Sequence, residues 1–151
     1  LRMGLGAYEK SINDKIIVVK PKSFFEQEEM LMKFLKINLP SIGLVVIDTV
    51  GMYYRVQARK NFLLANESLK RQLELIRKFV DEKNVSVLIA NQVYTDLNTG
   101  EYKMVGHTVM SKRSDVLIEL TKNEKRGLRI LMPLEKECAF VIQDEGLVVE
   151  Q

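Results

Sequence analysis

Two short apolar runs, each followed by polar residues, organise this chain. The first run covers residues 43–47 and ends at Asp48, and the second covers residues 86–90 and ends at Asn91 and Gln92. Each run has the length and apolar content of a parallel strand that is buried on both faces. Open α/β sheets bind ligands at the carboxyl ends of such strands. We therefore expect these three polar side chains to lie at one edge of a sheet.

Helical patterns separate the two runs. A capping-box pattern over residues 23–26 predicts a helix that begins there and continues to about Ile37. Residues 51–60 are interpreted as a loop. A long amphipathic helix follows, because apolar residues recur at helical spacing at Phe62, Leu69, Leu73, Ile76 and Val80.

The remaining segments favour strands. An apolar segment over residues 14–20 predicts a first strand, and residues 94–106 are interpreted as a polar loop. Three further segments, residues 116–120, 128–134 and 139–143, are joined by turns typical of hairpins. The prediction is an α/β fold with one mixed sheet, in which helices flank central parallel strands and an antiparallel extension forms the C-terminal part.

Composition restricts the class of protein. A chain of 151 residues with 46% hydrophobic content is expected to form one soluble domain. Charged residues interrupt every apolar run well before the roughly 20 residues that a membrane span needs. Cys138 is the only cysteine and no signal-peptide pattern is visible, so a cytoplasmic location is expected. The net charge of +3 is compatible with weak attraction to nucleic acid, but many other domains are equally basic.

The polar residues at the strand ends allow two interpretations each. In ATPases, a carboxylate at this position holds the water shell of Mg²⁺, and an amide on the neighbouring strand can sense the γ-phosphate. Asp48 could equally be a plain strand cap, and Asn91 and Gln92 could be solvated loop residues. The single histidine, His107, lacks the companions of a metal site or a catalytic triad, so we expect it to occupy a turn after Gly106.

Several motifs occur in a characteristic order. Residues 44–49 look like a Walker B strand, and residues 91–93 look like the amide motif that leads into a DNA-facing loop. Residues 106–117 are similar to the return segment, and residues 127–147 to the closing hairpins. Together they resemble the RecA superfamily of recombinase ATPases, and most closely its small archaeal RadB branch. The resemblance covers nearly the whole chain and implies a RecA-like core over residues 1–151.

The resemblance also implies roles for individual residues. Asp48 would coordinate Mg²⁺ through water, Asn91 would support the Mg²⁺ and water network, and Gln92 would link the γ-phosphate to the second loop. Six cations would bind DNA: Arg55, Arg59, Lys60, Lys103, Lys112 and Arg113. Tyr53 and Tyr54, beside the first three cations, could stack on bases. The alternative is that these cations form a solvated face and that the two tyrosines are core residues. Contacts of this kind read the backbone, so DNA binding is expected to be sequence-tolerant and to favour single strands.

One motif of the superfamily is missing. None of the eight glycines is followed by Lys-Ser or Lys-Thr, so no loop of this chain cradles the β and γ phosphates. No candidate for the water-activating glutamate is found either. We therefore expect a single ATPase core domain without its N-terminal phosphate-binding part. The resemblance implies a DNA-dependent ATPase, but we expect that this chain alone does not hydrolyse ATP. Binding of ATP and Mg²⁺ would need an upstream phosphate-binding loop.

The expected function is homologous recombination and DNA repair. In this interpretation the protein binds ATP and DNA as a recombinase or a mediator, with a recombinase or a second copy of the chain as its protein partner. One alternative is a degenerate, non-catalytic interaction module, which the missing glutamate and an apparently shortened turn at residues 135–137 support. Another is a signalling ATPase of the same fold without DNA binding. Binding to single-stranded DNA would separate the last possibility from the first.

Overall fold

The computed structural model describes residues 16–36, 42–96, 100, 102–122, 126–144 and 146–149. The chain divides into two compact units. One unit comprises Val19–Arg113, and the other contains Ser114–Gln151 together with the chain up to Val18. The prediction of a single domain over residues 1–151 stays a prediction.

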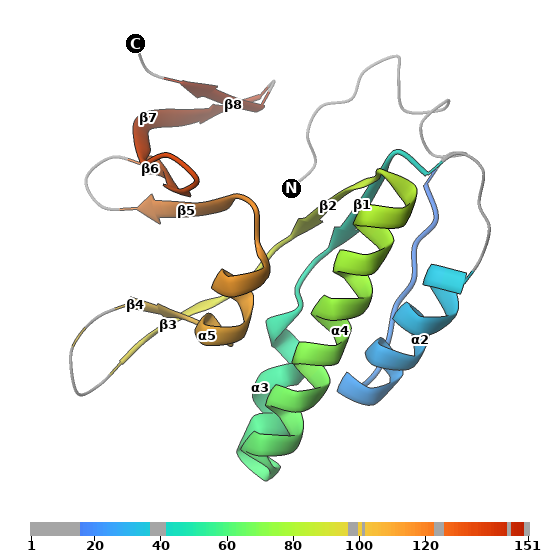
Figure 1. Cartoon of the computed structure of the whole chain (residues 1–151). Coiled ribbons are helices and arrows are strands. Elements are labelled where there is room, and N and C mark those ends of the chain that lie inside the picture. The colour runs from blue at the N-terminus through green and yellow to red at the C-terminus, as the bar shows by residue number, and fades with distance from the viewer. Residues whose placement is uncertain are drawn as a thin grey trace. The chain divides into compact units, whose positions relative to one another are not determined.

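The Val19–Arg113 unit is built on two parallel strands. β1 (Leu44–Ile47) pairs with β2 (Ser86–Ile89) from Leu44 opposite Ser86 to Ile47 opposite Ile89. This pairing confirms the predicted parallel strands. Their expected burial on both faces was wrong, because Leu44, Val46 and Leu88 on one face are each 56% exposed. Figure 1 shows α3 (Gly51–Lys60) and α4 (Phe62–Lys83) as a helical hairpin, with α2 (Phe24–Lys36) alongside α4. The other elements of the unit are the antiparallel pair β3 (Val93–Thr95) and β4 (Tyr102–Met104), α5 (His107–Met110) and the 3-10 helix η1 (Ser111–Arg113).

The predicted long helix is confirmed as α4, and it supplies much of the core. Leu69, Leu73 and Ile76 are buried at helical spacing and pack with side chains of α2, α3 and α5. Val80 lies at the edge of this cluster. Phe62 does not belong to the core, because 61% of its surface is exposed.

Local hydrogen bonds explain where the helices begin and end. The Glu26 amide donates to Ser23 Oγ at 3.1 Å, and the Glu26 carboxylate accepts from the amide of Lys22 at 2.6 Å. The capping-box prediction is therefore confirmed, while the predicted end at Ile37 lies outside the described residues. Asn61 Oδ1 accepts from the Leu64 amide and begins α4, which ends at Asn84 in the left-handed region.

Three sequence-based expectations were wrong. Residues 51–60 form the helix α3 rather than a loop. Only Gly51 and Tyr54 are buried on this helix, which leaves too little apolar periodicity to reveal it. Residues 16–20 belong to no strand, because they have no neighbouring strand to share hydrogen bonds; residues 14 and 15 lie outside the described residues. The expected polar loop contains the strands β3 and β4, which pair with each other.

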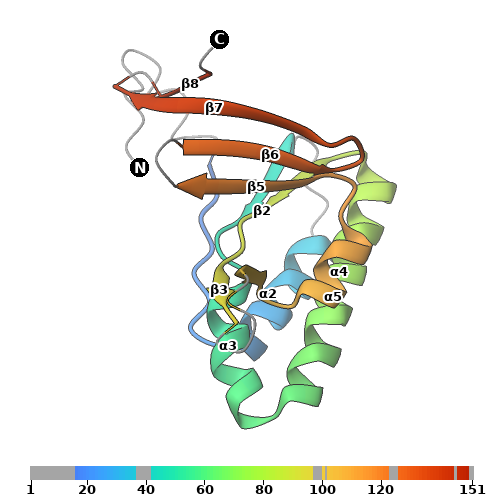
Figure 2. The same cartoon turned by 90° about the vertical axis from the view of Figure 1, so that its left-hand side faces the viewer.

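The second unit contains a four-stranded antiparallel sheet, and Figure 2 shows its first three strands side by side. The antiparallel C-terminal extension is thus confirmed. The single mixed sheet was wrong, because these strands and the parallel pair have separate hydrogen-bonding partners among the described residues. Lys136 and Glu137, expected in a turn, begin a strand. The strands follow in chain order: β5 (Leu117–Lys122), β6 (Arg126–Met132), β7 (Lys136–Gln143) and β8 (Gly146–Val149).

Candidate functional site

The ends of the two parallel strands are joined directly. The Ala90 amide donates to the Ile47 carbonyl at 2.9 Å, and the Val50 amide donates to the Ala90 carbonyl at 3.3 Å. Parallel strands bring their carboxyl ends to the same edge. The structure therefore brings together the strand ends that carry Asp48 on one side and Asn91 on the other.

Asp48 occupies the turn that follows β1, and its side chain is exposed. The peptide bond to Thr49 is cis. Thr49 Oγ1 is buried and has no hydrogen-bond partner among the described residues. Sequence reasoning missed Thr49, although a hydroxyl residue directly after a strand-end acid was a visible signal.

Asn91 already has intramolecular partners. Its Nδ2 donates to the Val105 carbonyl at 2.7 Å, and its Oδ1 accepts from the Gln92 amide at 2.9 Å. A Cβ atom at Gly51 would lie 2.6 Å from Asn91 Oδ1, so a larger residue at the start of α3 would displace the Asn91 side chain from its hydrogen bonds. These hydrogen bonds favour a positioning role for Asn91, which holds the chain after β2 against the segment after β4. Its predicted role in a Mg²⁺ and water network stays a prediction.

Gln92 contacts one of the predicted DNA-binding cations. Arg55 Nη1 donates to Gln92 Oε1 at 3.3 Å, between α3 and the segment after β2. The two residues are 37 positions apart in sequence. The structure thus places an amide at the strand end next to an exposed guanidinium that can bind phosphate.

The other five cations differ in their surroundings. Lys103 lies 2.5 Å from Asp96, and Arg113 lies 2.8 Å from Glu74. No hydrogen bond or ion pair within the described part of the chain involves the remaining three, which are exposed: Arg59, Lys60 and Lys112. The structure therefore leaves three of the six cations available, while it engages Lys103 and Arg113 internally.

The two tyrosines differ in burial. Tyr54 is only 6% exposed, and its hydroxyl donates to Asn66 Oδ1 at 2.7 Å. Tyr53 is half-buried, and its hydroxyl donates to the Pro21 carbonyl at 2.7 Å. For Tyr54 the core interpretation therefore holds and base stacking was wrong, whereas base stacking by Tyr53 stays a prediction.

Burial raises the pKa of the Tyr54 phenol, and the nearby Tyr94 adds to this effect. The contribution of Tyr54 to the free energy of unfolding is fully present at pH values below the phenol pKa of the unfolded chain, about 10. It is lost as the pH rises through the higher pKa of the folded state. Urea unfolding between pH 8 and 11 should show that the free energy of unfolding falls less steeply with pH in Tyr54→Phe than in the parent. The exposed Tyr102→Phe serves as the control. Equal pH dependence in all three proteins would contradict this assignment.

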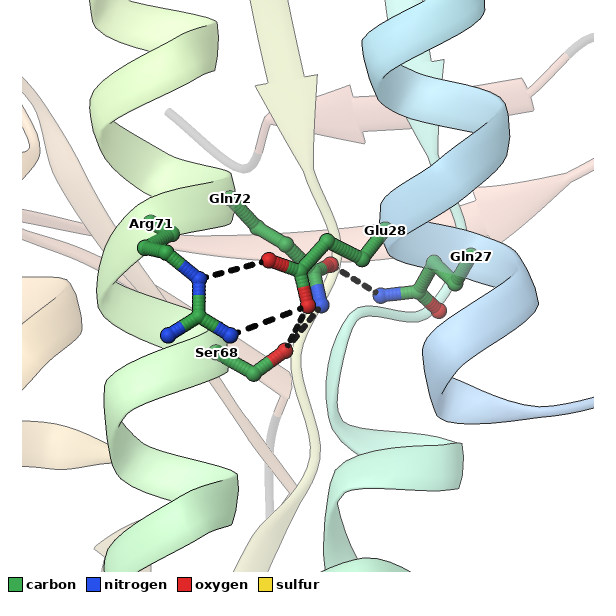
Figure 3. Close-up of polar contacts among 5 residues, drawn as sticks. All are labelled: Gln27, Glu28, Ser68, Arg71 and Gln72. Carbon is green, nitrogen blue, oxygen red and sulfur yellow. Dashed lines mark hydrogen bonds and ion pairs between the residues drawn. The ribbon is translucent and has the colours of Figure 1, made fainter.

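A buried polar cluster joins α2 to α4, and sequence reasoning missed it (Figure 3). Glu28 accepts from Ser68 Oγ at 2.5 Å and from Arg71 Nε at 2.8 Å. Gln27 Nε2 donates to Gln72 Oε1 at 2.8 Å, and Gln72 Nε2 donates to Ser68 Oγ at 3.2 Å. Hydrogen bonding to Glu28 raises the pKa of Arg71. The visible signal was the pair Ser68 and Gln72, one turn apart on the apolar side of α4.

Comparison with known proteins decides the family. The Rad51 family model matches residues 4–150. The chain belongs to the Rad51 family. Its fold resembles that in the crystal structure of the RadB recombinase, with a TM-score of 0.69 and 25% identity over 89% of this chain and 63% of that one. This similarity confirms the RecA-like fold class and the resemblance to the RadB branch.

Curated relatives of this Rad51-family chain are DNA repair and recombination proteins named RadB. The protein of Pyrococcus horikoshii is 31% identical over 92% of this chain and 61% of its own length. The protein of Methanococcoides burtonii is 25% identical over 94% of this chain and 67% of its own length. The chain thus spans about two thirds of the length of the curated relatives it matches.

Rad51-family proteins bind ATP with Mg²⁺, so we tested whether the residues present fit this group. The described residues contain no cluster of three or more His, Cys, Asp or Glu side chains that could hold a metal directly. The exposed Asp48 fits a contact to Mg²⁺ through water, and the Gln92 amide fits a phosphate oxygen. No glycine of the sequence is followed by the Lys-Ser or Lys-Thr pair that ends a phosphate-binding loop. Its residues fit one edge of a bound Mg·nucleotide.

None of the helices in the described part of the chain combines the length and apolar character that crossing a membrane requires.

Proposed function

We propose that this chain is the strand-end and DNA-facing part of a protein of homologous recombination and DNA repair, acting as a recombinase or as a mediator. The hydrogen bond between Arg55 and Gln92 carries this proposal. It joins a phosphate-seeking cation to an amide at the carboxyl end of a parallel strand, where α/β sheets bind ligands. The RadB relatives, which are DNA repair and recombination proteins, support it.

Each strand-end residue has a distinct task in this proposal. Asp48 would hold the Mg²⁺ of a bound nucleotide through water, and Gln92 would face its phosphates. Asn91 keeps the Gln92 backbone in place through the hydrogen bond that it accepts. Bound Mg·ATP would supply the charged phosphates against which these side chains become ordered.

DNA contact would use the exposed side of α3. Arg55 and Arg59 are four residues apart, so they lie on one side of the helix, and Lys60 follows at its end. Side chains of this kind bind phosphates and leave base identity unread. The preferred substrate is single-stranded DNA of any sequence. Lys103 and Arg113 would join only after leaving Asp96 and Glu74.

The second candidate function is a non-catalytic module that docks on a recombinase or on a second copy of the chain. Two observations favour it: internal ion pairs engage Lys103 and Arg113, and large apolar side chains are exposed where α3 meets α4. A signalling ATPase of the same fold is a third possibility, and binding to single-stranded DNA would separate it from the proposed recombination protein.

The salt dependence of DNA binding tests the proposal. Replacing Arg55 and Arg59 by alanine should weaken binding to unrelated single-stranded oligonucleotides about equally. The slope of log affinity against log salt should flatten by roughly one to two units, because each phosphate contact contributes about 0.7. A matched control removes two cations from α2, as Lys33→Ala with Lys36→Ala, and should leave the slope unchanged. Unchanged binding in the α3 variant would move the DNA surface elsewhere, and loss for only one sequence would contradict backbone reading.

A further inference from the structure

The outward side of α3 and the start of α4 combine exposed apolar and positive side chains. Met52 and Val56 lie one turn apart on α3 and are 48% and 58% exposed. Phe62 and Leu63, the first residues of α4, are 61% and 73% exposed. We call these four residues the α3–α4 ridge, together with the cations that lie among them: Arg55, Arg59 and Lys60.

The ridge is preformed. Asn61 separates the two helices; its amide donates to the Gln57 carbonyl at 2.9 Å, and its side chain accepts from the Leu64 amide at 3.0 Å. The opposite sides of the helices are anchored by the buried Tyr54 and the fully buried Ala65. A partner would therefore meet ordered helices, and little conformational entropy would be lost on the side of this chain.

The charge of the ridge selects its partner. Residues 51–66 contain three cations and neither Asp nor Glu. The chain as a whole carries 20 acidic residues, so about two would be expected in a stretch of this length. A surface with uncompensated positive charge attracts carboxylates and disfavours basic partners.

The apolar side chains favour protein over DNA as the partner. Three of the four apolar residues of the ridge, Met52, Val56 and Leu63, are aliphatic, so they gain nothing from phosphates and have no planar face on which a base could stack. The fourth, Phe62, has a ring that could do so. Exposed apolar side chains that are grouped beside charged ones are typical of protein-binding surfaces. We propose that the α3–α4 ridge docks an acidic amphipathic segment of a partner protein. Apolar side chains of that segment cover the ridge, and its carboxylates pair with the cations.

This docking goes beyond the proposed function and has a consequence for it. Arg55, Arg59 and Lys60 would serve both DNA and the acidic segment. The two ligands therefore compete, and a bound partner protein keeps DNA away from α3.

Fluorescence anisotropy with three probes tests the docking. The first is a synthetic 16-residue peptide with Leu and Phe at helical spacing and Glu and Asp between them, the second has Lys in place of the acids, and the third is an oligo-dT strand. Replacing Phe62 and Leu63 by serine should weaken binding of the acidic peptide by about tenfold or more. It should change oligo-dT affinity by less than about twofold, because phosphate contacts dominate that affinity. The exposed pair on α2, Phe25→Ser with Met32→Ser, is the matched control and should bind all probes like the parent.

The outcomes separate the two proposals. If the parent binds the acidic peptide and the ridge variant does not, docking is supported. If the parent in addition does not bind oligo-dT, the proposed function is contradicted while docking still stands. Equal affinity for the acidic and basic peptides, or no binding of the acidic peptide at all, overturns docking. If the ridge variant loses oligo-dT binding but still binds the acidic peptide, the docking proposal is also overturned. The ridge would then contact the bases of DNA.

Discussion

Replacing Leu69 by alanine should lower the free energy of unfolding of the Val19–Arg113 unit by about 3 to 4 kcal/mol, the range for large cavities in well-packed cores. Leu69 is 1% exposed at the centre of the core cluster. Its Cδ2 fills the space in which a Cβ atom of Gly106 would lie, only 2.7 Å away. The substitution therefore removes contacts between α4 and the turn before α5. Urea unfolding followed by circular dichroism measures the change.

The matched control for Leu69 lies on the same helix. Leu63 is 73% exposed, so Leu63→Ala should change the free energy of unfolding by less than about 0.5 kcal/mol. A similar change in both variants would show that α4 does not anchor the core as the structure indicates.

Replacing Glu28 by alanine should cost about 2 to 3 kcal/mol of unfolding free energy, because the change removes one member of a buried network and leaves its partners without an acceptor. Ser68 would lose its 2.5 Å hydrogen bond and Arg71 its 2.8 Å ion pair. Ser68 is fully buried, so water cannot replace the lost acceptor without rearrangement. Chemical denaturation of the purified protein again gives the measurement.

The neighbouring residue provides the control for Glu28. Glu29 is exposed and, among the described residues, forms an ion pair only with Lys33 on the same helix, so Glu29→Ala should cost less than about 0.5 kcal/mol. Glu28→Gln keeps an acceptor for Ser68 and should be milder than Glu28→Ala. If Glu28→Ala and Glu29→Ala cost the same, the cluster between α2 and α4 does not hold these helices together.

The sequence predicted the elements whose signals are local. Leu69, Leu73 and Ile76 mark the buried side of α4 by spacing alone, and Ser23 and Glu26 mark the start of α2 by hydrogen bonds within one turn. The helix α3 could not be predicted in this way, because its stability depends on one buried ring and on packing against α4. Sequence periodicity cannot report packing that a distant helix supplies.

The candidate site was predictable only in its placement. The rule for parallel strands gave the common edge for Asp48 and Asn91, but their contacts depend on residues far away in sequence. Gln92 meets Arg55 across 37 positions, and Gln27 meets Gln72 across 45. Such pairs form because folded helices approach each other, and a single sequence carries no periodic signal for them.

A rotation of α3 would have its pivot at Gly51, where the helix packs closely against Asn91. A Cβ atom on Gly51 would lie 2.6 Å from Asn91 Oδ1, so the first turn of α3 packs closely against the chain after β2. A ten-residue helix is about 15 Å long and stiff, so a rotation of about 4° at Gly51 displaces Lys60 by roughly 1 Å. A small rotation of α3 about its first turn would thus move the exposed cations at its far end more than the residues beside Asn91.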